Sequence, residues 1–259
     1  MSEKKGTIKS VAKAISIIML LVHNRKPMSL SSIASELGMA KSTAHGLIST
    51  LLDEGCISQN QDTGFYELGN KMYEIGASVT MYWDEKTIAK PYILKLVEKY
   101  QETVHLAKLS DGQVLYIDKQ ESTQSAYIVS EMGFKLPAHC TGLGKVLLSG
   151  LSNNEIRLII KRQPLVPYTE NTIVDIEDLI IEIEGVRRNR YSRDAQEFVD
   201  GVSCIAVPIY NHQNKITASL SVSFSMARAD KTFIEQVKSD LLSISHDIST
   251  KLGSTYFSE

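Results

Sequence analysis

The sequence predicts an α+β protein of two domains: a small helical head that ends in a β-hairpin, and a larger body with an antiparallel sheet and flanking helices. Three observations lead to this fold class. Apolar residues recur every three to four positions up to Gly55, which is the spacing of amphipathic helices. Turn sequences at Gln61–Gly64 and Asp111–Gly112 separate segments that alternate like strands. The chain of 259 residues is long enough for two hydrophobic cores.

Three helices are predicted in the head. The first covers Ser10–Val22 and is expected to turn six apolar residues inward, namely Val11, Ala14, Ile15, Ile18, Leu21 and Val22. Ser29 can cap a second helix, which Gly38 ends. The third helix begins at Lys41, ends at Gly55 and is expected to bury Ala44, Leu47, Ile48, Leu51 and Leu52. Because few residues connect the last two helices, they must cross steeply, as in a helix-turn-helix.

The outer face of the third helix carries short polar side chains, which suit contacts with bases and phosphates in a major groove. A plain solvated helix face is the alternative. A hairpin of Cys56–Gln59 and Phe65–Leu68 follows, so residues 1–69 are predicted to form a winged helix-turn-helix. Residues 1–50 also carry seven lysines and arginines against two glutamates. We therefore predict that double-stranded operator DNA contacts Lys41, Ser42, Thr43, His45 and Ser49.

The remaining chain is predicted as a linker helix over residues 70–86 and a second domain over residues 87–259. Alternating apolar residues predict strands at Val104–Leu109, Val114–Lys119, Ala126–Val129, Val202–Tyr210 and Ile216–Phe224. Helical periodicity predicts helices over 87–101, 142–149, 152–162, 174–190 and 230–251. A long connection spans residues 130–141. An antiparallel sheet flanked by helices, with such a connection, suits a domain that senses a small molecule.

The cysteines and the apolar runs indicate the cellular compartment of the protein. Cys56, Cys140 and Cys204 are odd in number and widely spaced, which supports neither a disulfide framework nor a zinc ribbon. The apolar run Ile15–Val22 is much shorter than the ~20 residues that a membrane span needs. We expect a cytoplasmic protein with no membrane partner, no metal and no cofactor.

Three blocks of sequence resemble one family. Lys41–Leu51 and Tyr66–Gly69 are similar to its recognition helix and wing, and Gly133–Lys145 is similar to its lid loop and the helix that follows. In the third block, Asp194 and Glu197 precede Gly201–Pro208. In this order and spacing, the blocks resemble the IclR-type transcriptional regulators over essentially the whole chain.

The resemblance implies a transcriptional regulator, expected to be a repressor, with a GAF-like effector domain that binds operator DNA as a homodimer or homotetramer. It also implies an effector site made of Gly142, Leu143, Asp194, Cys204, Ser221 and Ser223. The chemistry is coherent, because glycines at a helix start leave N–H groups open to a carboxylate. Ser221 and Ser223 would point from one strand face, and Asp194 could accept a hydrogen bond from the ligand. The implied effector is a small organic acid or sugar acid.

Two positions depart from the family pattern. Gly46 stands where members usually carry an arginine, which removes a DNA contact and weakens the helix by roughly 1 kcal/mol relative to alanine. Leu143 replaces a commonly smaller residue, which predicts a tighter or more apolar pocket.

Other interpretations of the second domain stay open at this point. Ser221 and Ser223 could be the solvated face of a strand, and Cys204 could be a core cysteine. A thiol enzyme would use Cys140 or Cys204 as nucleophile with His105 or His139 as base, although adjacent His139 and Cys140 point apart in an extended strand. Oxidation of Cys204 could instead be the signal. A metal site of His105, His139 and Cys204 lacks local ligand spacing.

Overall fold

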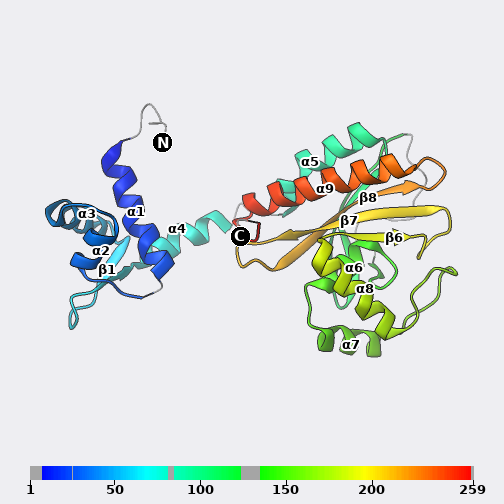
Figure 1. Cartoon of the computed structure of the whole chain (residues 1–259), viewed down its shortest axis with the longest axis horizontal. Helices are drawn as coiled ribbons and strands as arrows, with labels where there is room; N and C mark the ends of the chain where they lie inside the picture. The colour runs from blue at the N-terminus through cyan, green and yellow to red at the C-terminus, as the bar shows by residue number, and fades with distance from the viewer. Residues whose placement is uncertain (1–7, 25, 81–84, 124–134, 258–259) are drawn as a thin grey trace. The chain divides into compact units, whose positions relative to one another are not determined.

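The computed structural model describes residues 8–24, 26–80, 85–123 and 135–257 (Figure 1). The chain divides into two compact units, Met1–Tyr82 and Trp83–Glu259, called the first and second unit below. In the described segments, no helix combines the length and the apolar character that crossing a membrane would require.

The first unit is a winged helix-turn-helix, as predicted. Ser29 caps the second helix by accepting a hydrogen bond from the backbone N–H of Ser32, and Gly38 turns the chain with a φ of 60°. β1 and β2 form the two-stranded wing. The elements are α1 (Lys9–Asn24), α2 (Leu30–Glu36), α3 (Lys41–Asp53), β1 (Ile57–Gln59), β2 (Tyr66–Leu68) and α4 (Asn70–Thr80).

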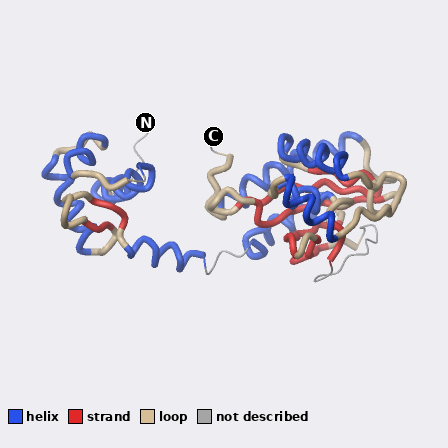
Figure 2. The backbone as a smooth tube through the Cα atoms, turned by 90° about the horizontal axis from the view of Figure 1, so that it is seen from below, coloured by secondary structure: helices blue, strands red, loops and turns tan. Residues whose placement is uncertain are grey.

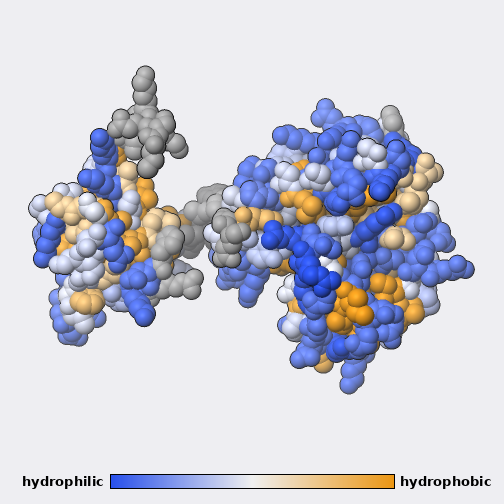
Figure 3. Space-filling model, in the orientation of Figure 1, coloured by the Kyte–Doolittle hydropathy of each residue, from blue (hydrophilic) through white to orange (hydrophobic). Residues whose placement is uncertain are grey.

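The inward face of α1 differs from the prediction. Among the residues of α1 whose burial is described, Ile17 and Leu21 are buried, whereas Val11, Ile15 and Val22 are 44–53% exposed. Nearly every residue from Ile15 to Val22 is apolar, so periodicity could not define the rotation of this helix; packing against α3 and β2 defines it. Val11, Ile15, Met19 and Val22 consequently form an exposed apolar stripe, and apolar side chains are visible on this unit in Figure 3.

The second unit is a six-stranded antiparallel sheet between two layers of helices, in the order β5-β4-β3-β8-β7-β6 (Figures 1 and 2). α5 and α9 cover one face, and α6 packs on the other with α8 behind it. The strands are β3 (Thr103–Ser110), β4 (Gln113–Gln120), β5 (Lys135–Pro137), β6 (Ser192–Ala195), β7 (Val202–Tyr210) and β8 (Ile216–Ser225). The helices are α5 (Glu85–Tyr100), α6 (Gly142–Ser149), α7 (Asn153–Arg162), α8 (Ile176–Asn189) and α9 (Lys231–Lys251).

The α+β fold class is confirmed, and the five predicted helices of this unit begin and end within two residues of their predicted bounds. The sequence did not reveal β5 and β6, because both are short edge strands without apolar alternation. The predicted strand Ala126–Val129 and the first part of the predicted connection, residues 130–134, lie outside the described residues. Residues 85–86, predicted to end the linker helix, begin α5 instead.

The two faces of the central strands differ in chemistry. Val104, Leu106, Leu220 and Val222 pack with α5 and α9 in one apolar core. Residues that alternate with these face the α6 side: His105 lies opposite Ser221, and Thr103 lies opposite Ser223. These four polar residues are also buried, at 0–7% exposure. A buried polar face needs hydrogen-bond partners, which makes this side of the sheet the place to look for a site.

Candidate functional site

A cavity of about 80 Å³ lies between the polar face of the sheet and the start of α6. All six strands of the sheet, the start of α6 and the loop after β6 contribute to its wall. The lining residues are His105, Tyr116, Leu136, Thr141, Leu143, Asp194, Phe198, Val199, Val202, Cys204, Ser221 and Ser223.

The start of α6 is held directly against the sheet. The side chain of Thr141 caps the helix, accepting a hydrogen bond from the Gly144 N–H at 3.1 Å. A Cβ at Gly142 would lie 2.7 Å from the sulfur of Cys204, and one at Gly144 would lie 2.2 Å from the carbonyl oxygen of Ala138. Only glycine permits both approaches. The first N–H groups of α6, at the positive end of its dipole, therefore lie beside the cavity, where they favour an anion.

Asp194 is the acidic group of the cavity wall and is 6% exposed. Its Oδ1 accepts a hydrogen bond from the backbone N–H of Glu197 at 2.7 Å. Burial raises the pKa of this carboxyl group to about 7; the charge of Glu197 acts in the same direction, while backbone N–H groups and Lys145 oppose it. Near neutral pH, the cavity can thus hold Asp194 in either protonation state.

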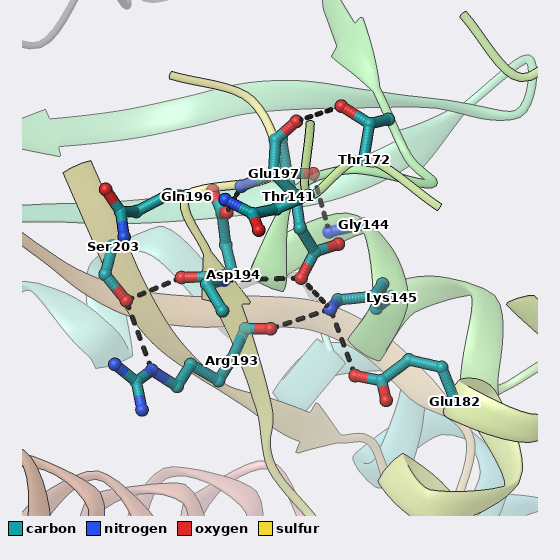
Figure 4. A network of polar contacts seen from close by, with 12 residues as sticks. Thr141, Gly144, Lys145, Thr172, Glu182, Arg193, Asp194, Gln196, Glu197 and Ser203 are labelled. Carbon is teal, nitrogen blue, oxygen red and sulfur yellow. Dashed lines mark hydrogen bonds and ion pairs between the residues drawn. The ribbon is translucent and has the colours of Figure 1, made fainter. Parts of the chain in front are cut away.

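Lys145 ties the loop after β6 to α6, as Figure 4 shows. Its ammonium group, 1% exposed, donates to Glu197 Oε1 at 2.6 Å, to Glu182 Oε1 at 3.0 Å and to the carbonyl oxygen of Arg193 at 2.7 Å. Burial disfavours the charge of Lys145, but the two glutamates outweigh it and raise the pKa above its usual value. The lysine thereby fixes the segment that carries Asp194.

The strand side of the cavity consists of neutral polar groups. Ser221 Oγ is buried and has no hydrogen-bond partner among the described residues. Ser223 Oγ lies 3.4 Å from Nδ1 of His105. Burial, assisted by the nearby charge of Lys119, lowers the pKa of His105 to about 3, so the imidazole is neutral. These groups can donate to or accept from hydroxyl or carbonyl groups of a ligand.

The structure brings most of the predicted effector residues together. Leu143, Asp194, Cys204, Ser221 and Ser223 line the cavity, and Gly142 lies directly behind Cys204. Ser221 and Ser223 do not form a solvated strand face, since they are 0% and 7% exposed. Sequence reasoning placed no effector role on His105, Tyr116, Thr141 or Phe198; for His105, the available signal was its strand position opposite Ser221.

The cysteines are poor nucleophiles here. Burial raises the pKa of both Cys140 and Cys204 to about 12, so both thiols are protonated. Nε2 of His139 lies 3.1 Å from the carbonyl oxygen of Val166. The geometry therefore favours neither a thiol enzyme nor a readily oxidised sensor. Across the described parts of the chain, histidine, cysteine and acidic side chains nowhere gather into a group of three that could hold a metal ion.

The second candidate surface is the outer face of α3 in the first unit. Ala44, Ile48 and Leu51 anchor this helix in the core. The five predicted DNA-contacting residues, Lys41, Ser42, Thr43, His45 and Ser49, are all exposed. Gly46 is also on the surface, and nothing lies within 4 Å of where its Cβ would be.

Comparisons with known proteins cover nearly the whole chain. Residues 10–61 match the family model "IclR helix-turn-helix domain", and residues 78–250 match "Bacterial transcriptional regulator IclR C-terminal". The HTH-type transcriptional regulator XynR of Escherichia coli strain K12 is 32% identical over 95% of this chain and 98% of its own. The acetate operon repressor of Salmonella typhimurium strain LT2 is 28% identical over 96% and 92%.

Two solved structures are similar to this chain over nearly its whole length. The Thermotoga maritima IclR structure is 30% identical, with a TM-score of 0.63 over 96% of this chain and 100% of that one. The Agobacterium tumefaciens repressor BlcR shares the fold with a TM-score of 0.80 at 24% identity, over 95% of this chain and 98% of that one.

A helix-turn-helix unit with an exposed polar helix face, followed by a separate unit with a cavity, is the design of a two-domain DNA-binding transcriptional regulator. The matches over both units make the assignment specific: the chain belongs to the IclR family of transcriptional regulators.

Proposed function

We propose that this protein is a homodimeric transcriptional repressor whose affinity for its operator changes when a small organic acid or sugar acid occupies the cavity of the second unit. The observation that carries the proposal is the cavity itself, in which the start of α6 faces the unpaired hydroxyl of Ser221. The family relatives named as repressors support the direction of control.

The two sides of the cavity suit the two ends of such a ligand. The N–H groups at the start of α6 favour a carboxylate. His105, Ser221 and Ser223 offer neutral hydrogen-bonding groups for hydroxyl or carbonyl oxygens. An effector can shift DNA binding only if it binds the two states of the protein with different affinities.

The proposal is tested by thermal-shift screening of the full chain against small organic and sugar acids, followed by operator binding with and without each acid that stabilises the protein. Stabilisation by an acid that also changes operator affinity supports the proposed function. Acids that stabilise the protein without changing operator affinity would contradict regulation by this cavity.

Ser221→Ala is expected to weaken effector binding about tenfold, because the variant loses one hydrogen bond to the ligand. The stability of the unliganded protein should stay equal or rise slightly, since the hydroxyl of Ser221 is buried without a partner. Ser219→Ala is the matched control: Ser219 Oγ bonds to the Val207 carbonyl at 3.1 Å and does not line the cavity. Titration calorimetry and urea unfolding measure both effects. Equal effector affinity in the two variants would remove Ser221 from the site.

His45→Ala combined with Ser49→Ala is expected to lower specific operator affinity at least tenfold, because both side chains lie on the exposed face of α3. The matched control is the pair Ser239→Ala and His246→Ala, an exposed serine and histidine on α9 of the second unit. Fluorescence anisotropy at several salt concentrations measures affinity and the number of phosphate contacts. If the two double variants bind the operator with equal affinity, α3 is not the helix that contacts the bases.

The exposed stripe of α1 is the surface on which we expect a second copy to pack. Operators with two half-sites require two recognition helices, and a dimer interface would bury these apolar side chains. Ile15→Lys combined with Met19→Lys should therefore shift the protein from dimer toward monomer in analytical ultracentrifugation. Leu158→Lys with Ile181→Lys, at two exposed apolar positions of α7 and α8, is the control. A dimer that survives the α1 changes would place its interface elsewhere.

The sequence alone also suggests Met81, Tyr82 and Trp83 as dimer contacts or as residues that pack on the chain's own second domain, but these residues lie outside the described part of the chain.

A further inference from the structure

Around Asp194, acidic side chains outnumber the cations that pair with them. Lys145 is the cation that pairs with the carboxylates of the network, those of Glu197 and Glu182, whereas the side chain of Arg193 donates to Ser203 Oγ at 3.3 Å. Asp194 adds a third carboxyl group, and its own charge is stabilised chiefly by backbone N–H groups rather than by an ion pair. One lysine therefore serves three acidic groups before any ligand enters.

The other titratable groups around Asp194 add no positive charge. His105 and His139 have pKa values lowered by burial, and the thiols of Cys140 and Cys204 and the phenol of Tyr116 have pKa values raised by burial, so all five are neutral. Lys119 on β4 lies directly opposite His105, does not line the cavity, and pairs with Glu121 at 2.9 Å. Among the described residues, no cationic side chain lines the cavity.

An anionic effector would thus bring a second carboxylate next to Asp194 in a buried space. The start of α6 supplies a partial charge of only about +0.5, enough for one carboxylate. Two carboxylates that share a buried site cannot both stay ionised without a cation, and one of them takes up a proton.

Resting on the proposed function, we propose that the cavity takes its effector as a monoanion together with one proton from solvent, which Asp194 carries. The ligand carboxylate stays ionised and lies against the backbone of Gly142 and Leu143 at the start of α6, since the N–H of Gly144 already donates to Thr141. The protonated Asp194 then donates its O–H to the ligand. Because the described residues that line the cavity include no cationic side chain, a second carboxylate at the far end of the ligand would find no cation there to neutralise it.

Similar acids are therefore expected to differ in their affinity for the cavity according to their number of carboxylates. A hydroxylated monocarboxylate presents neutral oxygens to Ser221, Ser223 and His105. The corresponding dicarboxylate would place a charge against these neutral, buried groups and lose affinity. The cavity is therefore expected to separate D-gluconate from D-glucarate, and lactate from malate.

The test is titration calorimetry of the full chain with D-gluconate, D-glucarate, lactate, malate and pyruvate. Titrations at about pH 6 and about pH 8, in two buffers of different ionisation enthalpy, count the protons taken up. We expect close to one proton per monoanion at the higher pH and few at the lower, with affinity that weakens up to tenfold per unit of pH above neutrality. Each dianion should bind at least tenfold more weakly than its monoanionic partner.

Two variants complete the experiment. In Asp194→Asn the amide oxygen still accepts from the N–H of Glu197, and the amide NH₂ stands where the acid carries its O–H. This variant should bind the monoanion with an affinity independent of pH and take up no proton. Asp200→Asn, an exposed position of the same loop, should keep the pH dependence of the unmodified protein.

The outcomes distinguish a failure of proton-coupled binding from a failure of the proposed acid sensing on which it rests. Monoanions that bind the unmodified protein without proton uptake, or dianions that bind equally well, would overturn the present inference and leave acid sensing intact. If none of the five acids binds at either pH, acid sensing itself fails, and the inference fails with it.

Discussion

Lys145→Met is expected to destabilise the second unit by about 3–5 kcal/mol, because it leaves a buried carboxylate without its cation. Glu197 is 5% exposed and receives its ion pair from Lys145 at 2.6 Å. Methionine has a similar volume and fills the space, so loss of charge pairing rather than a cavity dominates the effect. Urea unfolding followed by circular dichroism measures the change in the free energy of unfolding.

A second change should restore much of this loss. Glu197→Gln in the Lys145→Met background removes the unpaired charge, so the double variant should be markedly more stable than Lys145→Met alone. Lys161→Met on α7, at an exposed lysine, is the control and should change stability by less than about 0.5 kcal/mol. A Lys145→Met variant as stable as the control would show that the buried network does not hold the loop in place.

Asp194→Asn is expected to stabilise the unliganded protein at about pH 8 by about 2–4 kcal/mol. The folded protein raises the pKa of this carboxyl group from 3.8 to about 7, so folding favours the protonated form. That stabilisation is fully present below pH 3.8 and is lost as the pH rises to about 7. Asparagine cannot ionise, so the variant keeps its stability at the higher pH.

Urea unfolding of both proteins at about pH 5 and about pH 8 measures the difference. The variant should gain most over the unmodified protein at about pH 8 and less than half as much at about pH 5. Asp200→Asn, which changes an exposed carboxylate, should follow the unmodified protein at both values. A stability difference between Asp194→Asn and the unmodified protein that is the same at both pH values would contradict a raised pKa.

The cavity, unlike the ion pairs of Lys145, lowers the stability of the unliganded fold. Asp194 is retained in a buried position where its ionised form is unfavourable. Such a cost is common at binding sites, because the ligand later supplies the missing partners. Ser221 carries a similar cost in stability on the opposite side of the cavity, because its buried hydroxyl has no hydrogen-bond partner among the described residues.

Local sequence was sufficient for most elements of the fold. Periodicity predicted α6 and α7 closely, and in the structure Thr141 and Ser152 cap these helices through bonds within one turn. The β3–β4 hairpin follows from Asp111 and Gly112, both at positive φ. β5 and β6 were missed because nothing in their few residues distinguishes an edge strand from a loop.

The sequence by itself determined the two-domain order, the polar face of α3 and, through the family resemblance, five of the twelve residues that line the cavity. Only the tertiary structure decided which face of α1 is buried, that Ser221 and Ser223 face a cavity rather than solvent, and that His105 joins them from β3. It also decided the pKa of Asp194. The reason is physical: periodicity and capping act over a few residues, whereas burial and charge pairing depend on segments brought together from across the chain, such as Lys145 and Glu197.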